Sequence, residues 1–495
     1  MVGRLRFTIS KLNQARDAKQ LSGMMTITFF TQILAVYKSS IIAANFGANI
    51  ELDAYNFANN LATFFLTFVS SGITTVVIPA YVKKLDKRAL DTFLTVVFLI
   101  TGILLAFTFL LRGQLVDLMT SREPEFRVYV CGVMLLTILI QVFPAILGVT
   151  TAYFQYIRRF NLPKIVLLFS NLGIVLVLSL WKNFTLYEYL YVLLIGAILQ
   201  FVIDLACAIK FGFRYRISFD LRNPRFRDIS LIFLPTLFST GIYKVNILID
   251  SLLSSNIGTG QLTILTYSNM VVTMVNTMVV GNLIIYAYPK IVKKVTVSES
   301  EAQAGLGKYI VNFHRVVCLI LVGFVCVGRE FIGLLFEHGE FSAMAATTVY
   351  YCMCIYMVDQ QNNIVRDLIY RFFFAHGDTK ITVKNGMLTS AVNIITSIIL
   401  VRIIGVFGII VGTLIAGTVS LISIVMRFKK KYDFLFNIRS VLKEYLETIT
   451  ISMITIVTVL LMKTILPTFH YIIAFLLYGL LCVVVYAIGL VLLKK

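Results

Sequence analysis

The sequence predicts an all-α polytopic membrane protein with about fourteen transmembrane helices. Of its 495 residues, 59% are hydrophobic and only 14% are charged. Apolar runs of about 20 residues recur from one end to the other, and a helix needs about that length to cross the hydrocarbon core of a membrane. An internal duplication and an uneven distribution of basic residues among the loops support the same fold class.

The expected spans follow one another along nearly the whole chain. They lie near residues 24–45, 55–81, 89–111, 128–154, 163–181, 187–209, 230–253, 262–289, 309–328, 344–370, 383–401, 406–426, 446–465 and 471–493. Residues 1–20 precede the first span and contain five basic residues, so we expect a basic cytoplasmic or interfacial helix there.

Basic residues gather in alternate loops, which predicts the orientation of the chain. The net charge is +20, and lysines and arginines crowd residues 83–88, 158–164, 213–228, 290–294 and 427–431. The positive-inside rule therefore places both termini in the cytoplasm. The gathering of basic residues in cytoplasmic loops explains the net positive charge, so no nucleic-acid partner is needed to account for it. Residues 213–228, the longest basic loop, fall at the join of the two halves and are expected to link them.

The two halves repeat a local pattern at an offset of roughly 206–210 residues, as an internal duplication would. Tyr37-Lys38 in the first span corresponds to Tyr243-Lys244 in the seventh. A glycine loop follows each pair, and a span rich in amides and hydroxyls follows each loop. Transporters are often built from such repeats, with the substrate bound between the halves.

The two lysines predict a cavity that attracts anions. Lys38 lies about 21 Å along its helix, at 1.5 Å per residue, and a charge at such a depth is costly unless it faces protein or water. Thr31 and Asn45 lie seven residues on either side of Lys38 and share its face. The polar stripes of the following spans are Asn56, Asn60, Thr63 and Thr67 in the first half, and Asn269, Thr273 and Asn276 in the second. The alternative is a snorkelling lysine and ordinary hydrogen bonds between helices.

No residue pattern indicates catalysis. The seven cysteines lie in or beside apolar spans without metal-ligand spacing, and the four histidines are scattered. No phosphate-binding glycine loop or nucleophile motif is present. We therefore expect neither an enzyme nor a bound cofactor.

The tenth span, residues 344–370, contains three charged residues: Asp359, Arg366 and Asp367. Intramembrane charges either pair with one another or take part in function. These residues are therefore expected to form a structural ion pair or to serve gating or substrate binding.

Several loop motifs carry a resemblance to a known family. Phe46-Gly47-Ala48, followed by Asp53-Ala54-Tyr55, lies after the first span, and Ala152-Tyr153 precedes Arg159-Phe160 and Pro163. The second half contributes residues 334–341 (LLFEHGEF) and 371–380 (RFFFAHGDTK). Together these motifs resemble those of the MurJ (MviN) lipid II flippases, which share a superfamily with the multidrug MATE exporters and the Wzx polysaccharide flippases.

The resemblance implies two pseudo-symmetric six-helix lobes plus two C-terminal helices. The lobes would comprise residues 21–212 and 229–430, joined by the linker 213–228, and residues 431–495 would hold the last two helices and a groove for a polyprenyl tail. It also implies a monomer in the bacterial cytoplasmic membrane that works by alternating access, alongside proteins of cell-envelope glycan synthesis. The cargo would be an undecaprenyl-diphosphate-linked glycan precursor.

Some family members bind sodium in the second lobe, so Na⁺ or H⁺ coupling is expected here. The matching residues are Asp250, Asn393, Ser397 and Thr413, although Asp250 could equally be an acid near the outer interface. The chain departs from the family where MurJ proteins typically carry cavity charges, at Gln32, Ser39, Ser71 and Asn269-Met270. Three alternatives therefore stay open: a Wzx-like capsule or wall-polysaccharide flippase, a cation-coupled MATE-type exporter, and a non-transporting scaffold for glycan synthesis.

Overall fold

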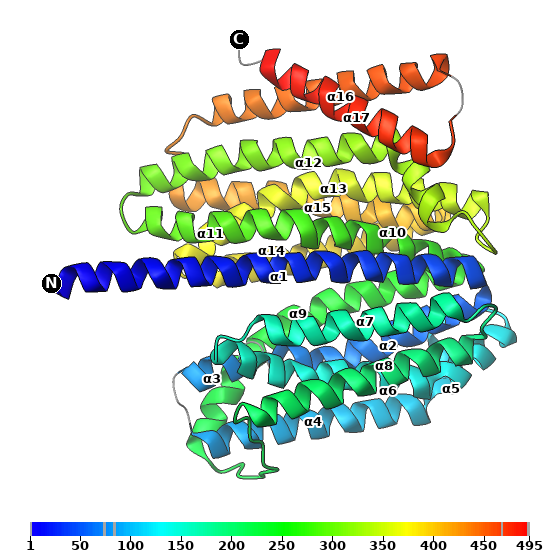
Figure 1. Ribbon diagram of the computed structural model, residues 1–495, viewed down its shortest axis with the longest axis vertical. Coiled ribbons are helices and arrows are strands. Elements are labelled where there is room, and N and C mark those ends of the chain that lie inside the picture. Colours follow the sequence, from blue (N-terminus) through cyan, green and yellow to red (C-terminus); the bar gives the residue numbers. More distant parts are fainter. Residues whose placement is uncertain (1, 73–75, 83–85, 467–468, 493–495) are drawn as a thin grey trace. The chain divides into compact units, whose positions relative to one another are not determined.

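The computed structural model describes residues 2–72, 76–82, 86–466 and 469–492. Side chains are described from residue 23 onward, with the exception of residues 67–72, 79, 82, 232, 235, 236 and 238–240. Within these ranges every regular element is a helix (Figure 1). The chain divides into two compact units, which comprise residues 1–41 with 50–248 and residues 42–49 with 249–495.

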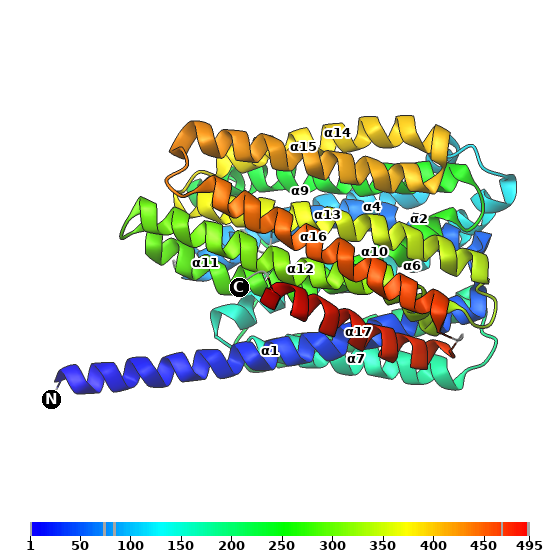
Figure 2. The same cartoon turned by 90° about the horizontal axis from the view of Figure 1, so that it is seen from above.

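Nine of the helices begin in the first unit. They are α1 (Val2–Phe46), α2 (Ile50–Gly72), α3 (Ile78–Val82), α4 (Lys87–Leu110), α5 (Arg112–Met119), α6 (Pro124–Tyr156), α7 (Asn161–Leu180), α8 (Leu186–Lys210) and α9 (Pro224–Ile257). The last turn of α1 and the last nine residues of α9 pack as part of the second unit. The basic residues expected to form a separate segment at 1–20 belong to α1, which runs unbroken into the first span (Figure 2).

The second unit continues with one long interrupted helix and six further helices. These are α10 (Gln261–Val275), the π-helix η2 (Asn276–Val280), α11 (Gly281–Val295), α12 (Glu299–Phe336), α13 (Ala343–Ala375), α14 (Thr379–Ile404), α15 (Val406–Tyr432), α16 (Ile438–Ile465) and α17 (Tyr471–Leu492). The π turn interrupts α10–α11 within the expected span 262–289, which the apolar pattern alone did not indicate.

The described part of each of the fourteen expected spans is largely helical, and eleven described helices are long and apolar enough to cross a membrane. The other three expected spans correspond to α2 with α3, to α9 and to α13. Charged side chains of α13, including Asp359 and Arg366, lower its apolar character.

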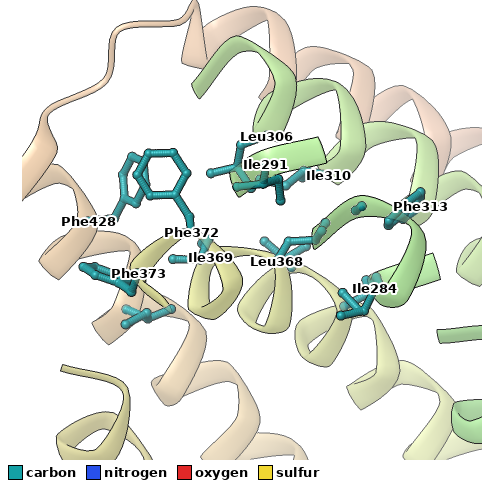
Figure 3. Packing of buried hydrophobic residues seen from close by; sticks show 14 of the residues in the cluster. Ile284, Ile291, Leu306, Ile310, Phe313, Leu368, Ile369, Phe372, Phe373 and Phe428 are labelled. Atoms are coloured by element: carbon teal, nitrogen blue, oxygen red, sulfur yellow. The ribbon is translucent and has the colours of Figure 1, made fainter. Parts of the chain in front are cut away.

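Apolar side chains fill the interior of each unit. In the first unit, α3, α4, α6 and α8 meet around Phe93 and Phe154, which are both buried. In the second unit, Ile284 and Ile291 of α11 pack with α12, α13 and α15 around Phe372 (Figure 3). These cores hold the polar membrane residues at fixed positions because buried aromatic rings leave little freedom for the helices that carry them.

The last two helices pack on α12. Buried Tyr478 and Cys482 of α17 lie against Val322 and Cys326 of α12, and Val459 of α16 joins the same cluster. Two ion pairs reinforce this packing: Lys463 of α16 lies 2.6 Å from Glu330, and Arg315 lies 2.9 Å from Glu444 of α16. The helices after the duplication are therefore part of the second unit.

Candidate functional site

The repeated lysines have similar surroundings in the two halves. Lys38 on α1 and Lys244 on α9 are both half-buried, whereas the preceding Tyr37 and Tyr243 are 50% and 61% exposed. Among the described residues, neither lysine forms a salt bridge. Both lysines belong to the first unit. A cation held inside a membrane helix without a carboxylate partner is suited to receive an anion.

The polar stripe of the first half lies toward the protein interior. Asn56 is buried, and Asn60 and Thr63 are half-buried on α2. Thr63 Oγ1 donates to the carbonyl of Asn59, while Asn59 Oδ1 accepts a 2.7 Å hydrogen bond from Gln141 of α6. The side chain of Thr67 lies outside the described residues. On α1, Thr31 Oγ1 donates to the carbonyl of Ile27 at 2.8 Å, and Asn45 is half-buried.

The corresponding stripe of the second half is exposed. Asn269, Thr273 and Asn276 follow one face of α10, and Thr273 Oγ1 lies 3.3 Å from Asn269 Oδ1. The stripe ends where the π turn begins at Asn276. Such turns occur often at functional sites because they displace a side chain from the regular helical register. This stripe therefore offers amide and hydroxyl groups that are free to contact a polar ligand.

The charged residues of α13 are joined through an amide. Asn363 Nδ2 donates to Asp359 Oδ2 at 3.1 Å, and Arg366 Nη2 donates to Asn363 Oδ1. No direct salt bridge of Arg366 occurs among the described residues, and its Nε is buried without a partner. Asp359 lies against Gly417 of α15, where a Cβ atom would collide with its carboxylate. Asp367 is half-buried on the same helix.

The residues matched to a sodium site supply neutral and anionic oxygens in the second unit. Asn393 Nδ2 of α14 donates to Thr413 Oγ1 of α15 at 2.9 Å, and Ser397 Oγ donates to the carbonyl of Ile409 at 3.3 Å. Asn393 Oδ1 and Asp250 Oδ1 are buried, and neither has a hydrogen-bond partner among the residues that the structure describes. Amide, hydroxyl, carbonyl and carboxylate oxygens are suitable ligands for a hard cation. The donor atoms of these residues are therefore of the type that a sodium ion prefers.

A groove follows α16 and α17. Its volume is about 830 Å³, and its lining is mostly apolar, with Leu446, Ile454 and Val485 along its length. Arg439, Lys443 and Glu447 also line it, and Lys443 Nζ lies 3.8 Å from the Glu447 carboxylate. Gly489 of α17 lies against Ile451, so the two helices approach closely at the base of the groove. The mostly apolar lining suits an alkyl chain.

Comparison with known proteins identifies the family. A sequence profile described as "Lipid II flippase MurJ" matches residues 42–480. The chain belongs to the MurJ lipid II flippase family. Curated relatives include a probable lipid II flippase MurJ of Rickettsia prowazekii, 22% identical over 408 residues that cover 79% of this chain and 80% of the relative. Another, from Synechocystis sp., is 23% identical over 424 residues, covering 81% and 79%.

Solved structures agree with the MurJ fold. A lipid II flippase MurJ in an inward closed conformation superposes with a TM-score of 0.80 at 20% identity, covering 94% of this chain and 97% of that one. An inward-facing MATE multidrug transporter gives a TM-score of 0.63 at 12% identity, covering 82% and 95%. MurJ and MATE proteins thus share the architecture described above, and the MurJ family is a family of membrane flippases.

The MurJ-like motifs around Tyr153 and Arg159 and at residues 334–341 contact the ends of other helices. The sequence did not indicate this role. Tyr153 Oη donates to the carbonyl of Phe211 at 2.8 Å, and the Arg159 guanidinium lies 3.9 Å from the Phe211 ring centre. The backbone N–H of Glu340 donates to the carbonyl of Ala44 at 2.9 Å, so the motif at 334–341 fastens the end of α1. These motifs therefore secure the ends of helices in the chain.

Proposed function

We propose that this protein is a flippase that moves an undecaprenyl-diphosphate-linked glycan precursor from the inner to the outer leaflet for cell-envelope synthesis. Membership of the MurJ family supports this substrate class. The cargo is lipid II or a related lipid-linked oligosaccharide. The lysine pair favours an anionic lipid over the cationic drugs of MATE-type exporters, because like charges repel in a medium of low dielectric constant.

The observation that carries the proposal is the pair Lys38 and Lys244. Each is half-buried within its helix, and neither has a carboxylate partner among the described residues. Each ammonium group would donate a charge-assisted hydrogen bond to the diphosphate, contributing roughly 1.5–3 kcal/mol. The polar stripe that contains Asn56, in the same unit as both lysines, would hydrogen-bond the sugar, with alternating access exposing the head group on each side in turn.

The groove along α16 and α17 would hold the polyprenyl tail. Its mostly apolar lining accepts an isoprenoid chain without loss of hydrogen bonds. The tail would thus stay in an apolar environment while the head group crosses.

We further propose fourteen spans with both termini in the cytoplasm, arranged as lobes 21–212 and 229–430 with helices α16 and α17 added. The alternation of basic loops supports this topology. A monomer suffices, since the duplication supplies two halves within one chain. A cysteine-accessibility map should place residues 213–228 and 429–431 inside and 122–127 outside, and termini on opposite sides would contradict the topology.

Sodium is the proposed coupling ion. The buried oxygens of Asp250 and Asn393 without partners support a cation site with Ser397 and Thr413. Asp250→Asn should abolish Na⁺-dependent thermal stabilisation of the purified protein. Unchanged stabilisation by Na⁺ in that variant would indicate proton coupling or no ion at these residues.

The lysine pair is tested by substitution. Lys38→Gln or Lys244→Gln should lower the affinity for an undecaprenyl-diphosphate-linked glycan about tenfold to a hundredfold. Arginine should restore part of it because the charge stays while the geometry of the donors changes. Lys164→Gln is the matched control, because this half-buried lysine donates to Thr28 Oγ1 at 2.8 Å and is expected to affect stability alone.

A double Lys38→Gln, Lys244→Gln variant decides the matter. If it folds and flips its lipid at the wild-type rate, the anion-binding role is wrong. A normal rate accompanied by a lower unfolding temperature would assign the two lysines to stability.

A further inference from the structure

The basic linker between α8 and α9 is fastened along α4. Ser218 Oγ and Thr92 Oγ1 lie 2.8 Å apart, and the hydroxyls of Tyr215 and Thr95 lie 2.8 Å apart. The backbone N–H of Ser218 also donates to Thr95 Oγ1 at 3.2 Å. Residues 213–222, which we name the strap, therefore follow the first turns of α4 without forming a helix of their own.

The contacts with α4 indicate how deep in the membrane the strap lies. Lys87–Leu110 is one of the helices long and apolar enough to cross a membrane, and Lys87 and Arg88 at its start are exposed. Thr92 and Thr95 lie within its first three turns, about 12 Å or less from its start at 1.5 Å per residue. The strap thus lies beside the part of α4 where head groups meet hydrocarbon.

The outward face of the strap combines apolar and basic side chains. Ile217, Phe219 and Leu221 alternate along the chain and are 74%, 61% and 58% exposed. The intervening Ser218 and Asp220 are half-buried instead, because both bond to Thr92 of α4. Arg214 and Arg216 before them are exposed as well, and so is Arg222 after them. Three neighbouring large apolar side chains on a polar loop are the kind of exposed patch that marks a site of interaction with a membrane or another protein.

We propose that the strap is a binding site for anionic phospholipid head groups, with Ile217, Phe219 and Leu221 inserted among the upper acyl chains. Exposed arginines flanking apolar side chains are the pattern of interfacial anchors, since the guanidinium groups meet lipid phosphates while the apolar groups leave water. The depth given by α4 favours a lipid surface over a soluble protein partner. The strap leads into α9, so the lipids that it binds contact the segment from which this helix begins.

The depth of the strap is tested with a single-tryptophan protein. Trp181 is the only tryptophan of the chain, so Trp181→Phe with Phe219→Trp places one indole on the strap. In nanodiscs, lipids brominated near the carbonyl end of the acyl chains should quench this indole, and aqueous acrylamide should quench it weakly. The control is Trp181→Phe with Val297→Trp, because Val297 is 69% exposed in the turn between α11 and α12 and should show the opposite behaviour.

The charge preference is tested with the same indole. Brominated phosphatidylglycerol should quench position 219 more than brominated phosphatidylcholine at equal mole fraction, with a preference of up to fivefold per arginine. Substituting Arg214, Arg216 and Arg222 by glutamine should abolish the preference and leave the depth unchanged. About 1 M NaCl should do the same with the arginines intact, because the Debye length falls to about 3 Å.

Two outcomes would overturn the proposal. An indole at 219 that acrylamide quenches and bromolipids do not would leave the strap in water, free for a protein partner. Equal quenching of the indole by brominated phosphatidylglycerol and brominated phosphatidylcholine, in the protein that keeps all three arginines, would show that the strap does not prefer an anionic lipid.

Discussion

Asp53 and Arg122 form a buried ion pair at the start of α2. Arg122 Nη1 lies 3.0 Å from Asp53 Oδ2, and the two side chains are 7% and 0% exposed. The Arg122 guanidinium also lies 4.4 Å from the centre of the Phe126 ring. Asp53 occupies the first turn of α2, where the helix dipole favours a carboxylate. The Asp53 motif of the MurJ family is thereby explained as a joint between α2 and the segment before α6.

Arg122→Ala is expected to destabilise the protein by about 3–5 kcal/mol, because it leaves the Asp53 carboxylate buried without its charge partner. The unfolding of purified protein in detergent measures this loss. Arg127→Ala is the matched control: Arg127 pairs with Asp117 at 2.8 Å, but both side chains are more than half exposed. It should cost less than about 1 kcal/mol. Equal losses in the two variants would contradict the role of burial.

The pair also marks the limit of what the sequence could predict. The helices followed from apolar runs, because a membrane demands about 20 apolar residues per crossing. Asp53 was part of a recognised motif, yet its partner is 69 residues away and carries no pattern of its own. Interactions between distant loops depend on packing, which periodicity does not encode.

Gly339 is expected to tolerate no side chain. Its φ is +62°, and a Cβ atom would collide with the backbone of Ala44. Gly339→Ala should therefore cost more than the roughly 1–2 kcal/mol of the left-handed conformation alone. Gly377, with φ of +74° and no atom within 4 Å of a Cβ, provides the control for the conformational term. Measured unfolding free energies that are equal for Gly339→Ala and Gly377→Ala would exclude the steric contact.

The Asp86 carboxylate is expected to make the contact between α4 and Asn223, the residue after the strap, sensitive to acid. Asn223 Nδ2 donates to Asp86 at 2.8 Å, and the Arg88 backbone N–H donates at 3.0 Å as a cap of α4. The Asn223 contact, followed by the Arg88 N–H, lowers the pKa of Asp86 below its ordinary value of 3.8. The folded state thus favours the charged form. The resulting stabilisation is complete above that ordinary pKa and is lost as the pH falls through the lower folded value.

Asp86→Ala should consequently cost about 1 kcal/mol at pH 7, as the loss of a helix cap does. The difference from wild type should shrink as the pH falls below about 4. Asp117→Ala, at a carboxylate outside this contact, serves as the control. A constant difference between Asp86→Ala and wild type across the pH range would show that the charge of Asp86 has no part in the effect.

The candidate site was predictable in its residue types but not in its surroundings. The repeat indicated Lys38 and Lys244, because the duplication places them at equivalent positions. It could not indicate that the Asn56 stripe is interior while the Asn269 stripe is exposed. Those differences arise from the neighbouring helices, because α2 packs against α4 and α6 whereas α10 packs against α13.

Asn363 is expected to matter chiefly because it joins two charges. It donates to Asp359 Oδ2 at 3.1 Å and accepts from Arg366, and hydrogen bonds to charged groups contribute about 1.5–3 kcal/mol each. Asn363→Ala should lower the unfolding free energy of the purified protein by at least that amount. Asn362→Ala is the control, since its hydrogen bond to Asp359 is longer, at 3.4 Å, and its closer partner is the neutral hydroxyl of Thr418 at 3.0 Å.

The decisive comparison places Asn363→Ala in a background without the charges, Asp359→Asn with Arg366→Gln. There the same substitution removes only neutral hydrogen bonds and should cost about 0.5–1.5 kcal/mol. The difference between the two backgrounds is the coupling of the amide to the charges, which a mutant cycle isolates for residues in contact. An identical cost of Asn363→Ala in both backgrounds would show that Asn363 only packs against its neighbours. A smaller cost without the charges would establish Asp359, Asn363 and Arg366 as one interacting unit within α13.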